Sequence, residues 1–185
     1  MQHYEQKFDN ALTYLQSPGI MNPAGDKPIC YITYDVEDVF EIRSLIDTSL
    51  IPKATYYGFH PHVISIGDII RQFVNENEFK DIFWVDENSE EALFDSIRTD
   101  IIQKKYVEDK LVEIQSGFAG ETKPLLIIKD LELLHPYGKI GAIENSIYNQ
   151  ISIPIIILYP GDAQGTARTF LNIYSMDGNY RSKNF

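Results

Sequence analysis

The chain has 185 residues, 44% of them apolar, and a formal net charge of −11. This length suits one hydrophobic core, and the composition does not shift along the chain, so a single domain over residues 1–185 is predicted. A surface this acidic repels phosphate groups, and the basic residues are not clustered, so direct nucleic-acid binding is not expected. No apolar run approaches the roughly 20 residues of a membrane span, so no membrane association is expected.

The single cysteine, Cys30, lies inside the apolar run Ile29–Ile32. This position predicts a buried structural thiol and argues against a nucleophile. The first residues, Met1–Glu5, are polar and lack the pattern of a signal peptide. A cytoplasmic location is therefore expected.

The first half of the chain alternates helical and strand patterns. Apolar residues at helical spacing between Tyr4 and Leu15 predict an amphipathic helix, which Pro18-Gly19 ends. After a loop, the continuous apolar run Ile29–Tyr34 is typical of a strand buried on both sides in a parallel sheet. The other elements predicted here are a helix over Val39–Ile46, a strand over His62–Ile66, a helix over Asp68–Val74 and a short strand over Asp81–Val85.

The strongest helical pattern lies in the second half. It begins at the capping residue Asn88, has Glu91 three positions later as in a capping box, and ends at Gly117. Because the span is long, a break within it is expected. The later predicted elements are a strand over Leu125–Ile128, a helix over Gly138–Gln150 and a strand over Ile153–Tyr159.

Strands separated by helix-length segments predict a three-layer α/β fold. In this fold, helices cover both faces of a mostly parallel sheet. At the C-terminal end, Asp177-Gly178 predicts the turn of an added antiparallel hairpin between Thr169–Tyr174 and a segment around Tyr180.

The predicted fold is like a degenerate P-loop domain. The run Leu125–Asp130 has the form of a Walker B strand, in which the aspartate orients a magnesium ion. The first strand should then lead into a glycine-rich phosphate loop with a lysine. Here the segment Tyr34–Val39 follows instead; it has no glycine or lysine, and its three acidic residues would repel a triphosphate. No nucleotide or other cofactor is therefore expected.

A metal-dependent hydrolase or nuclease is the enzymatic alternative. It would use carboxylates that follow predicted strand ends, namely Asp35, Glu37, Asp38 and Asp130. This site requires the carboxylates to converge on one ion. Glu121-Thr122-Lys123 has the letters of a nuclease motif but lies in a predicted loop.

The pair His60-Pro61-His62 could offer two imidazoles to a metal ion, but the sequence shows no third ligand. A loop followed by a strand is the favoured explanation of these residues. No complete catalytic motif is present, so a non-catalytic domain is predicted.

The C-terminal third has a more specific pattern. Its segments are Gly120-Glu121-Thr122-Lys123-Pro124, Leu134-His135-Pro136-Tyr137, Tyr159-Pro160-Gly161 after the apolar run from Ile153, and Asn179-Tyr180-Arg181. Their order resembles the BrxB family, the small component of bacterial BREX phage-exclusion defence systems. The likeness spans most of the chain, with its sharpest motifs between Gly120 and Arg181.

The resemblance implies a cytoplasmic scaffold or adaptor without a catalytic activity of its own. Family members are thought to join an assembly that includes a phosphatase-like PglZ protein, a large ATPase and a DNA methyltransferase, and these are the partners it implies. The motif residues available for such contacts are His135, Pro136, Tyr159, Pro160, Gly161, Tyr180 and Arg181.

The same motif residues also have structural explanations, so fold maintenance and partner contact both remain open. Tyr159-Pro160-Gly161 would leave a strand through a sharp turn, and His135-Pro136 would end a connection. For an exposed docking patch, the candidate is the aromatic group Tyr56-Tyr57-Gly58-Phe59 in a predicted loop.

Overall fold

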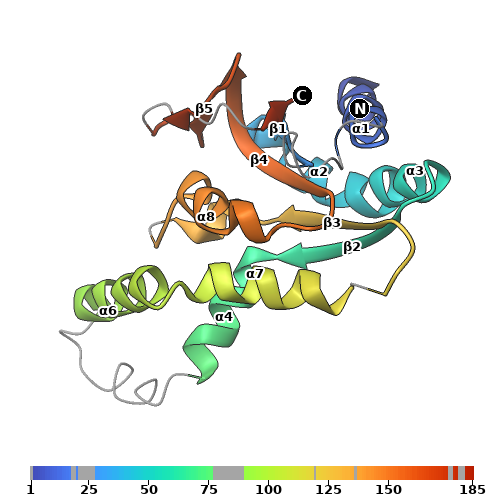
Figure 1. The fold of residues 1–185 in the computed structure, drawn as a ribbon. Coiled ribbons are helices and arrows are strands. Elements are labelled where there is room, and N and C mark those ends of the chain that lie inside the picture. Colours follow the sequence, from blue (N-terminus) through green and yellow to red (C-terminus); the bar gives the residue numbers. More distant parts are fainter. Residues whose placement is uncertain are drawn as a thin grey trace.

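The central sheet of the computed structural model has the strand order β2-β3-β4-β1-β7, and all neighbours in it are parallel (Figure 1). Its strands are β1 (Ile29–Tyr34), β2 (His60–Ser65), β3 (Pro124–Lys129), β4 (Ile155–Gln164) and β7 (Lys183–Asn184). The structure describes residues 2–17, 20, 28–76, 90–118, 120–135, 137–174, 177–178 and 182–185. The predicted α/β fold with a mostly parallel sheet is confirmed.

Helices cover both faces of the sheet (Figure 1). One face packs against α1 (Gln2–Leu15), α2 (Val39–Leu45) and α3 (Ile51–Tyr56). The other packs against α4 (Ile66–Glu76), α6 (Glu90–Gln103), α7 (Tyr106–Gly117) and α8 (Ile140–Ile147).

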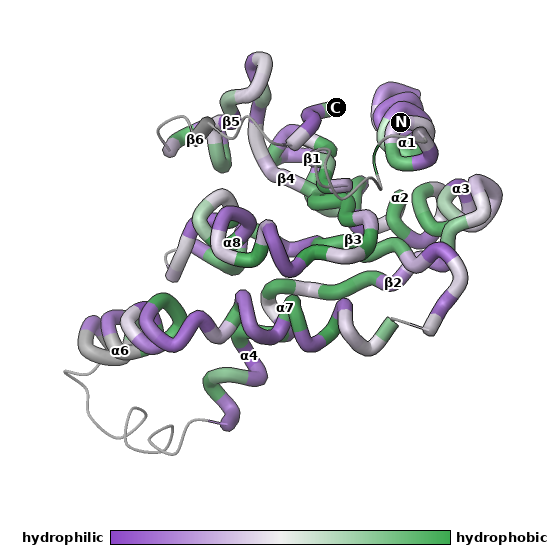
Figure 2. Tube along the Cα trace, viewed as in Figure 1, coloured by the Kyte–Doolittle hydropathy of each residue, from purple (hydrophilic) through white to green (hydrophobic). Residues whose placement is uncertain are grey.

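The side chains of each strand alternate between the two faces of the sheet, so one apolar run contributes to two hydrophobic cores. Ile29 and Tyr31 of β1 belong to the core on the α8 side of the sheet, whereas Cys30 and Ile32 belong to the core on the α1 side, because successive strand side chains point to opposite faces. Figure 2 accordingly draws β3 mostly in green. A strand buried on both sides needs an unbroken apolar run, as the sequence predicted.

Two helical predictions change in extent. The helix predicted over Val39–Ile46 continues to Tyr56, because the π-helical segment Ile46–Leu50 joins α2 to α3. The long helix breaks, as expected, between α6 and α7, where Lys105 has a φ of 51°. The predicted strand Asp81–Val85 and the capping residue Asn88 lie outside the described residues.

The antiparallel hairpin is present, but its turn is not at Asp177-Gly178. β4 pairs with β5 (Ala167–Phe170) through a turn at Gly165, and Asp177–Gly178 forms β6, which pairs with β5. The predicted sharp turn at Tyr159-Pro160-Gly161 is also wrong, because β4 continues through these residues. Gly161 has a φ of 131° and pairs with Phe170, so its backbone lets the strand pass from the sheet into the hairpin.

A polar cluster lies inside the core between β1, α8 and the C-terminal strand. The carboxyl group of Glu144 accepts hydrogen bonds from the hydroxyls of Tyr31 and Ser182. The Arg168 guanidinium lies 3.6 Å from the centre of the Tyr31 ring and donates a 2.9 Å bond to Asn184. Glu144, Tyr31, Arg168 and Ser182 are all buried. The cluster therefore ties the C-terminal segment to the sheet.

The thiol of Cys30 is fully buried, and this burial raises its pKa. We expect Cys30 not to react with Ellman's reagent in the folded protein, because a thiol is reactive only as an accessible thiolate. Denaturation in guanidinium should release one reactive thiol per chain. The colour that the reagent develops is followed over time. A rapid reaction of the native protein would contradict this burial.

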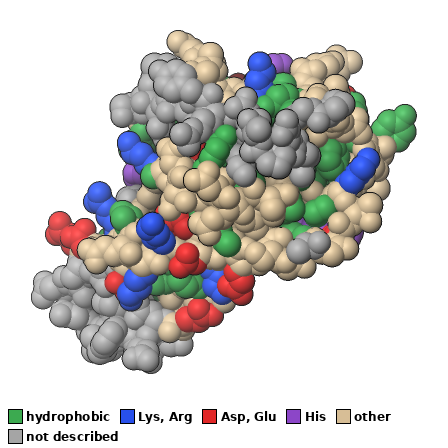
Figure 3. All heavy atoms as spheres, viewed as in Figure 1, with side chains coloured by type: hydrophobic (Ala, Val, Ile, Leu, Met, Phe, Trp, Pro, Cys, Tyr) green, Lys and Arg blue, Asp and Glu red, His purple; other side chains and the backbone are tan. Residues whose placement is uncertain are grey.

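Charged side chains of both signs are mixed on the outer helices. Lys104 pairs with Asp100 and Lys110 pairs with Glu113, and Figure 3 shows blue and red side chains next to each other over α6 and α7. Within the described ranges, no helix combines the length and apolar character required to cross a membrane.

Candidate functional site

A cleft opens at the carboxyl edge of the sheet, beside the ends of β3 and β4. An inner hollow of about 50 Å³ and an outer one of about 460 Å³ share the lining residues His135, Gly138, Lys139 and Tyr174. We call this region the carboxyl-edge cleft. Ligands of open α/β sheets bind at this edge, so its position matches the general rule.

A row of aromatic rings forms the inner wall of the cleft. Tyr159, at the end of the parallel part of β4, makes an edge contact with Phe170 at 5.5 Å between ring centres. Phe170 contacts Tyr174, whose ring lies 4.4 Å from that of His135. The row starts in the core, where Tyr31 contacts Tyr159, and so the wall is anchored by buried side chains.

Exposed apolar side chains gather around the same cleft. The described residues include six large hydrophobic side chains that are strongly exposed. Four belong to the segments that border the cleft: Phe94 (47% exposed), Ile102 (51%), Leu133 (45%) and Ile173 (75%). Ile102 lines the outer hollow directly, and Phe94 stacks on Tyr137, another lining residue. Such a concentration of exposed apolar groups is typical of a binding surface.

The rim of the cleft is polar and has both charges. Lys139 and Arg98 contribute cations, and Glu108 contributes a carboxyl group whose pKa is raised by partial burial. Burial also raises the pKa of Tyr137, so its phenol stays protonated as a hydrogen-bond donor. An apolar centre with a polar rim is the arrangement found in protein–protein interfaces.

The motif residues predicted from sequence divide between this cleft and the fold. His135 is exposed on the cleft and Tyr159 is its buried anchor, whereas Pro160 and Gly161 are buried in β4 where the hairpin begins. His135 also ends the short 3-10 helix Leu131–Leu134 in an extended conformation, as expected before a proline. The remaining predicted residues, Pro136, Tyr180 and Arg181, lie outside the described residues.

The four strand-end carboxylates do not come together as a metal site. Asp38 accepts a 2.5 Å hydrogen bond from the hydroxyl of Tyr4. Asp130 accepts a 3.0 Å bond from Arg43 Nε, and Arg43 also pairs with Glu132. Among the described residues, no three of Asp35, Glu37, Asp38 and Asp130 form a ligand group. The aspartate of the Walker-like strand is therefore paired with an arginine of α2.

The aromatic group predicted as a docking patch is largely part of the fold. Tyr56 ends α3 and is 89% exposed, but Phe59 is buried and Tyr57 is half-buried. The patch is thus reduced to one protruding ring. The carboxyl-edge cleft, whose apolar residues come from distant parts of the chain, could not be read from any one sequence segment.

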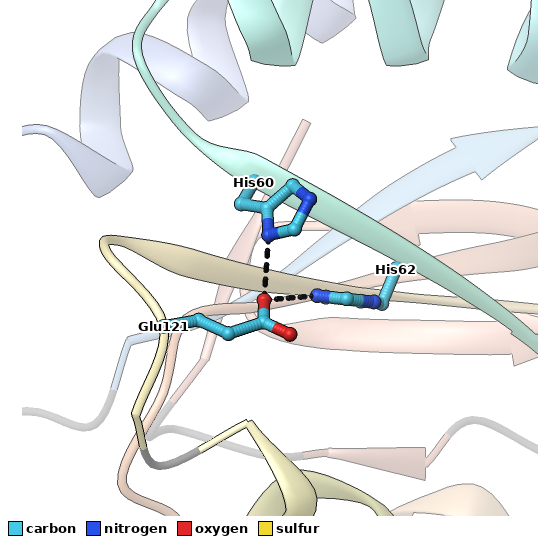
Figure 4. Close-up of side chains that lie close together, drawn as sticks. All are labelled: His60, His62 and Glu121. Atoms are coloured by element: carbon cyan, nitrogen blue, oxygen red, sulfur yellow. Dashed lines mark hydrogen bonds and ion pairs between the residues drawn. The ribbon is translucent and has the colours of Figure 1, made fainter.

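A second cluster lies at the opposite, amino edge of the sheet (Figure 4). His60 and His62 of β2 point toward Glu121, which precedes β3. Ligand-type atoms of the three side chains all lie within 4.8 Å of one another. Glu121 is thus the third ligand-type side chain, which the sequence did not show.

Comparison of the chain with protein-family models, with curated proteins and with solved structures finds no match in any of the three. The resemblance to the BrxB family therefore stays a prediction from the motif residues.

Proposed function

We propose that this protein is a non-catalytic scaffold or adaptor component of a bacterial BREX phage-defence complex, acting in the cytoplasm by binding other proteins of the system. The observation that supports this function best is the carboxyl-edge cleft. It joins an aromatic wall, the exposed apolar side chains of Ile102 and Phe94, and a polar rim at one place on the surface. The partners implied by the resemblance are the PglZ phosphatase-like protein, the large ATPase and the methyltransferase.

The cleft suits a protruding apolar side chain of a partner protein. The outer hollow of about 460 Å³ can admit a large side chain, and Ile102 and Tyr174 would pack against it. Lys139 and Arg98 at the rim would pair with acidic groups of that partner. Buried apolar anchors of this kind provide most of the binding free energy of an interface, and the rim charges add specificity.

The alternative function, a metal-dependent hydrolase at the strand-end carboxylates, is less well supported. Its residues Asp38 and Asp130 are engaged by Tyr4 and Arg43, and the four carboxylates are not gathered around one point. A hydrolytic site of that type requires several oxygens within bonding distance of the same ion.

The adaptor role is tested by co-expression with each of the three BREX proteins and purification through a salt wash. We expect stoichiometric recovery of one of them with the wild-type chain. Ile102→Asp should weaken that complex by about tenfold or more, because it places a charge in the apolar centre of the interface. Binding measured by isothermal titration with the purified partner gives the size of the effect.

Phe40→Asp is the matched control, since Phe40 is 77% exposed on α2, in the other helical layer. It should bind as the wild type does. Loss of binding in Phe40→Asp but not in Ile102→Asp would show that the interface lies outside the cleft. A wild-type chain that elutes without any of the three proteins would overturn the adaptor function.

A further inference from the structure

We propose that His60, His62 and Glu121 form a binding site for a divalent transition-metal ion of the zinc class, which clamps the turn before β3 onto the edge strand β2. The site is separate from the carboxyl-edge cleft and lies at the opposite edge of the sheet. It therefore adds a property that the adaptor function does not require.

The donor set determines the class of ion. Two imidazole nitrogens and one carboxylate oxygen are ligands that zinc accepts, whereas magnesium and calcium prefer oxygen ligands throughout. Three protein ligands leave a fourth tetrahedral position for water or for a side chain of another protein. All three residues are partly open to solvent, with side-chain exposures of 62%, 23% and 31% in chain order, so an ion can enter directly.

The ligand atoms are already close to coordinating geometry. Glu121 Oε2 lies 2.6 Å from His60 Nδ1 and 2.5 Å from His62 Nε2 (Figure 4). Around a tetrahedral zinc ion these atoms would be about 3.3 Å apart, so the carboxylate oxygen has to withdraw by roughly 0.7 Å. All three ligand atoms lie within 4.8 Å of one another, so rotations of the Glu121 side chain and of the two histidine side chains are needed to bring them to this spacing.

The fold holds the two elements of the site in register. His60 and His62 are two residues apart on one strand, so their side chains leave the same face. The backbone N–H of His60 donates a 2.9 Å bond to the carbonyl of Lys123, which fixes the turn containing Glu121 beside β2. The ring of His62 stacks on Phe118 with 3.7 Å between centres and 12° between planes, which orients its nitrogen.

Hydrogen bonds in the metal-free protein prepare Glu121 as a ligand. One oxygen of Glu121 is shared by the facing nitrogens of His62 and His60. A carboxylate only accepts, so both facing imidazole nitrogens then donate to the same oxygen. A bound ion would replace these two protons and link all three side chains.

The test is isothermal titration of tag-free protein with zinc chloride and, separately, magnesium chloride. We expect one zinc ion per chain, no saturable magnesium binding, and a higher thermal midpoint with zinc. Glu121→Gln and His62→Ala should each weaken zinc binding by about 100-fold or more, since each removes a direct ligand. Glu121→Gln preserves the size of the side chain, and its circular dichroism spectrum should match that of the wild type.

His3→Ala is the control, because His3 lies on α1, in the helical layer on the other face of the sheet. It should bind zinc as the wild type does. The proposed site is wrong if the wild type shows no saturable zinc binding, or if Glu121→Gln and His62→Ala bind as tightly as the wild type. Neither result depends on recovery of a BREX partner, so the two proposals fail independently.

Discussion

Replacing Glu144 by alanine is expected to lower the free energy of unfolding by about 3–5 kcal/mol, the largest effect of a single polar substitution that we predict. Glu144 is buried, and its carboxyl group accepts hydrogen bonds from the hydroxyls of Tyr31 and Ser182. Alanine leaves both hydroxyls without an acceptor, and each unsatisfied buried group costs about 1–3 kcal/mol. The guanidinium of Arg168 is buried against the same Tyr31 ring, so a shift of Tyr31 would disturb its packing as well.

Guanidinium denaturation followed by circular dichroism measures this change, with Glu144→Gln as the comparison. Glutamine keeps one acceptor oxygen, and its amide can donate to the second hydroxyl, so the hydrogen bonds can re-form. We expect Glu144→Gln to lose clearly less stability than Glu144→Ala. Equal losses would mean that the charge of Glu144, and not its hydrogen bonds, stabilises this part of the core.

Gly161→Ala is expected to lower the free energy of unfolding by about 3–5 kcal/mol and to disturb the cleft. Gly161 has a φ of 131°, and a Cβ atom there would lie only 2.0 Å from the carbonyl oxygen of Thr169. Relief of this clash must separate β4 from β5 and break the hydrogen bonds between them. Because β5 ends at Phe170, which belongs to the aromatic wall, the cleft would open as well.

Gly165→Ala is the matched control in the same hairpin. Its φ of 63° is also positive, but no atom lies within 4 Å of the position of an added Cβ. Gly165→Ala should therefore lower the free energy of unfolding by only about 1–2 kcal/mol, which is the cost of the backbone strain. The ratio of the two effects, from denaturant midpoints, separates the steric contribution from the conformational one. Similar losses for the two variants would refute close packing at Gly161.

Residues next to one another in the sequence predicted most of the elements correctly. The runs Ile29–Tyr34 and Leu125–Ile128 became strands buried on both faces, and the pattern from Tyr4 to Leu15 became α1. These predictions succeeded because the periodicity of apolar residues is a local property. The turns were less predictable: Asp177-Gly178 has the composition of a hairpin turn but forms β6, because its pairing with β5 prevailed over its local preference.

The candidate sites depended on contacts between distant residues. His60 and His62 were visible as a pair, but Glu121 reaches them only because β2 and β3 pair in parallel and bring their starts together. The carboxyl-edge cleft likewise combines side chains from α6, from the 3-10 helix after β3 and from the segment after β5. The spacing of such residues along the chain contains no signal for their proximity.

Four features follow from the sequence alone: the acidic charge, the buried apolar strands, the three-layer class of fold and the lack of a phosphate loop after the first strand. The folded structure was needed to show that Asp38 bonds to Tyr4, that Asp130 pairs with Arg43, and that Glu121 contacts two histidines. The physical reason is that apolar periodicity acts over a few residues, whereas the side chains of a site meet through strand order and register across the whole sheet.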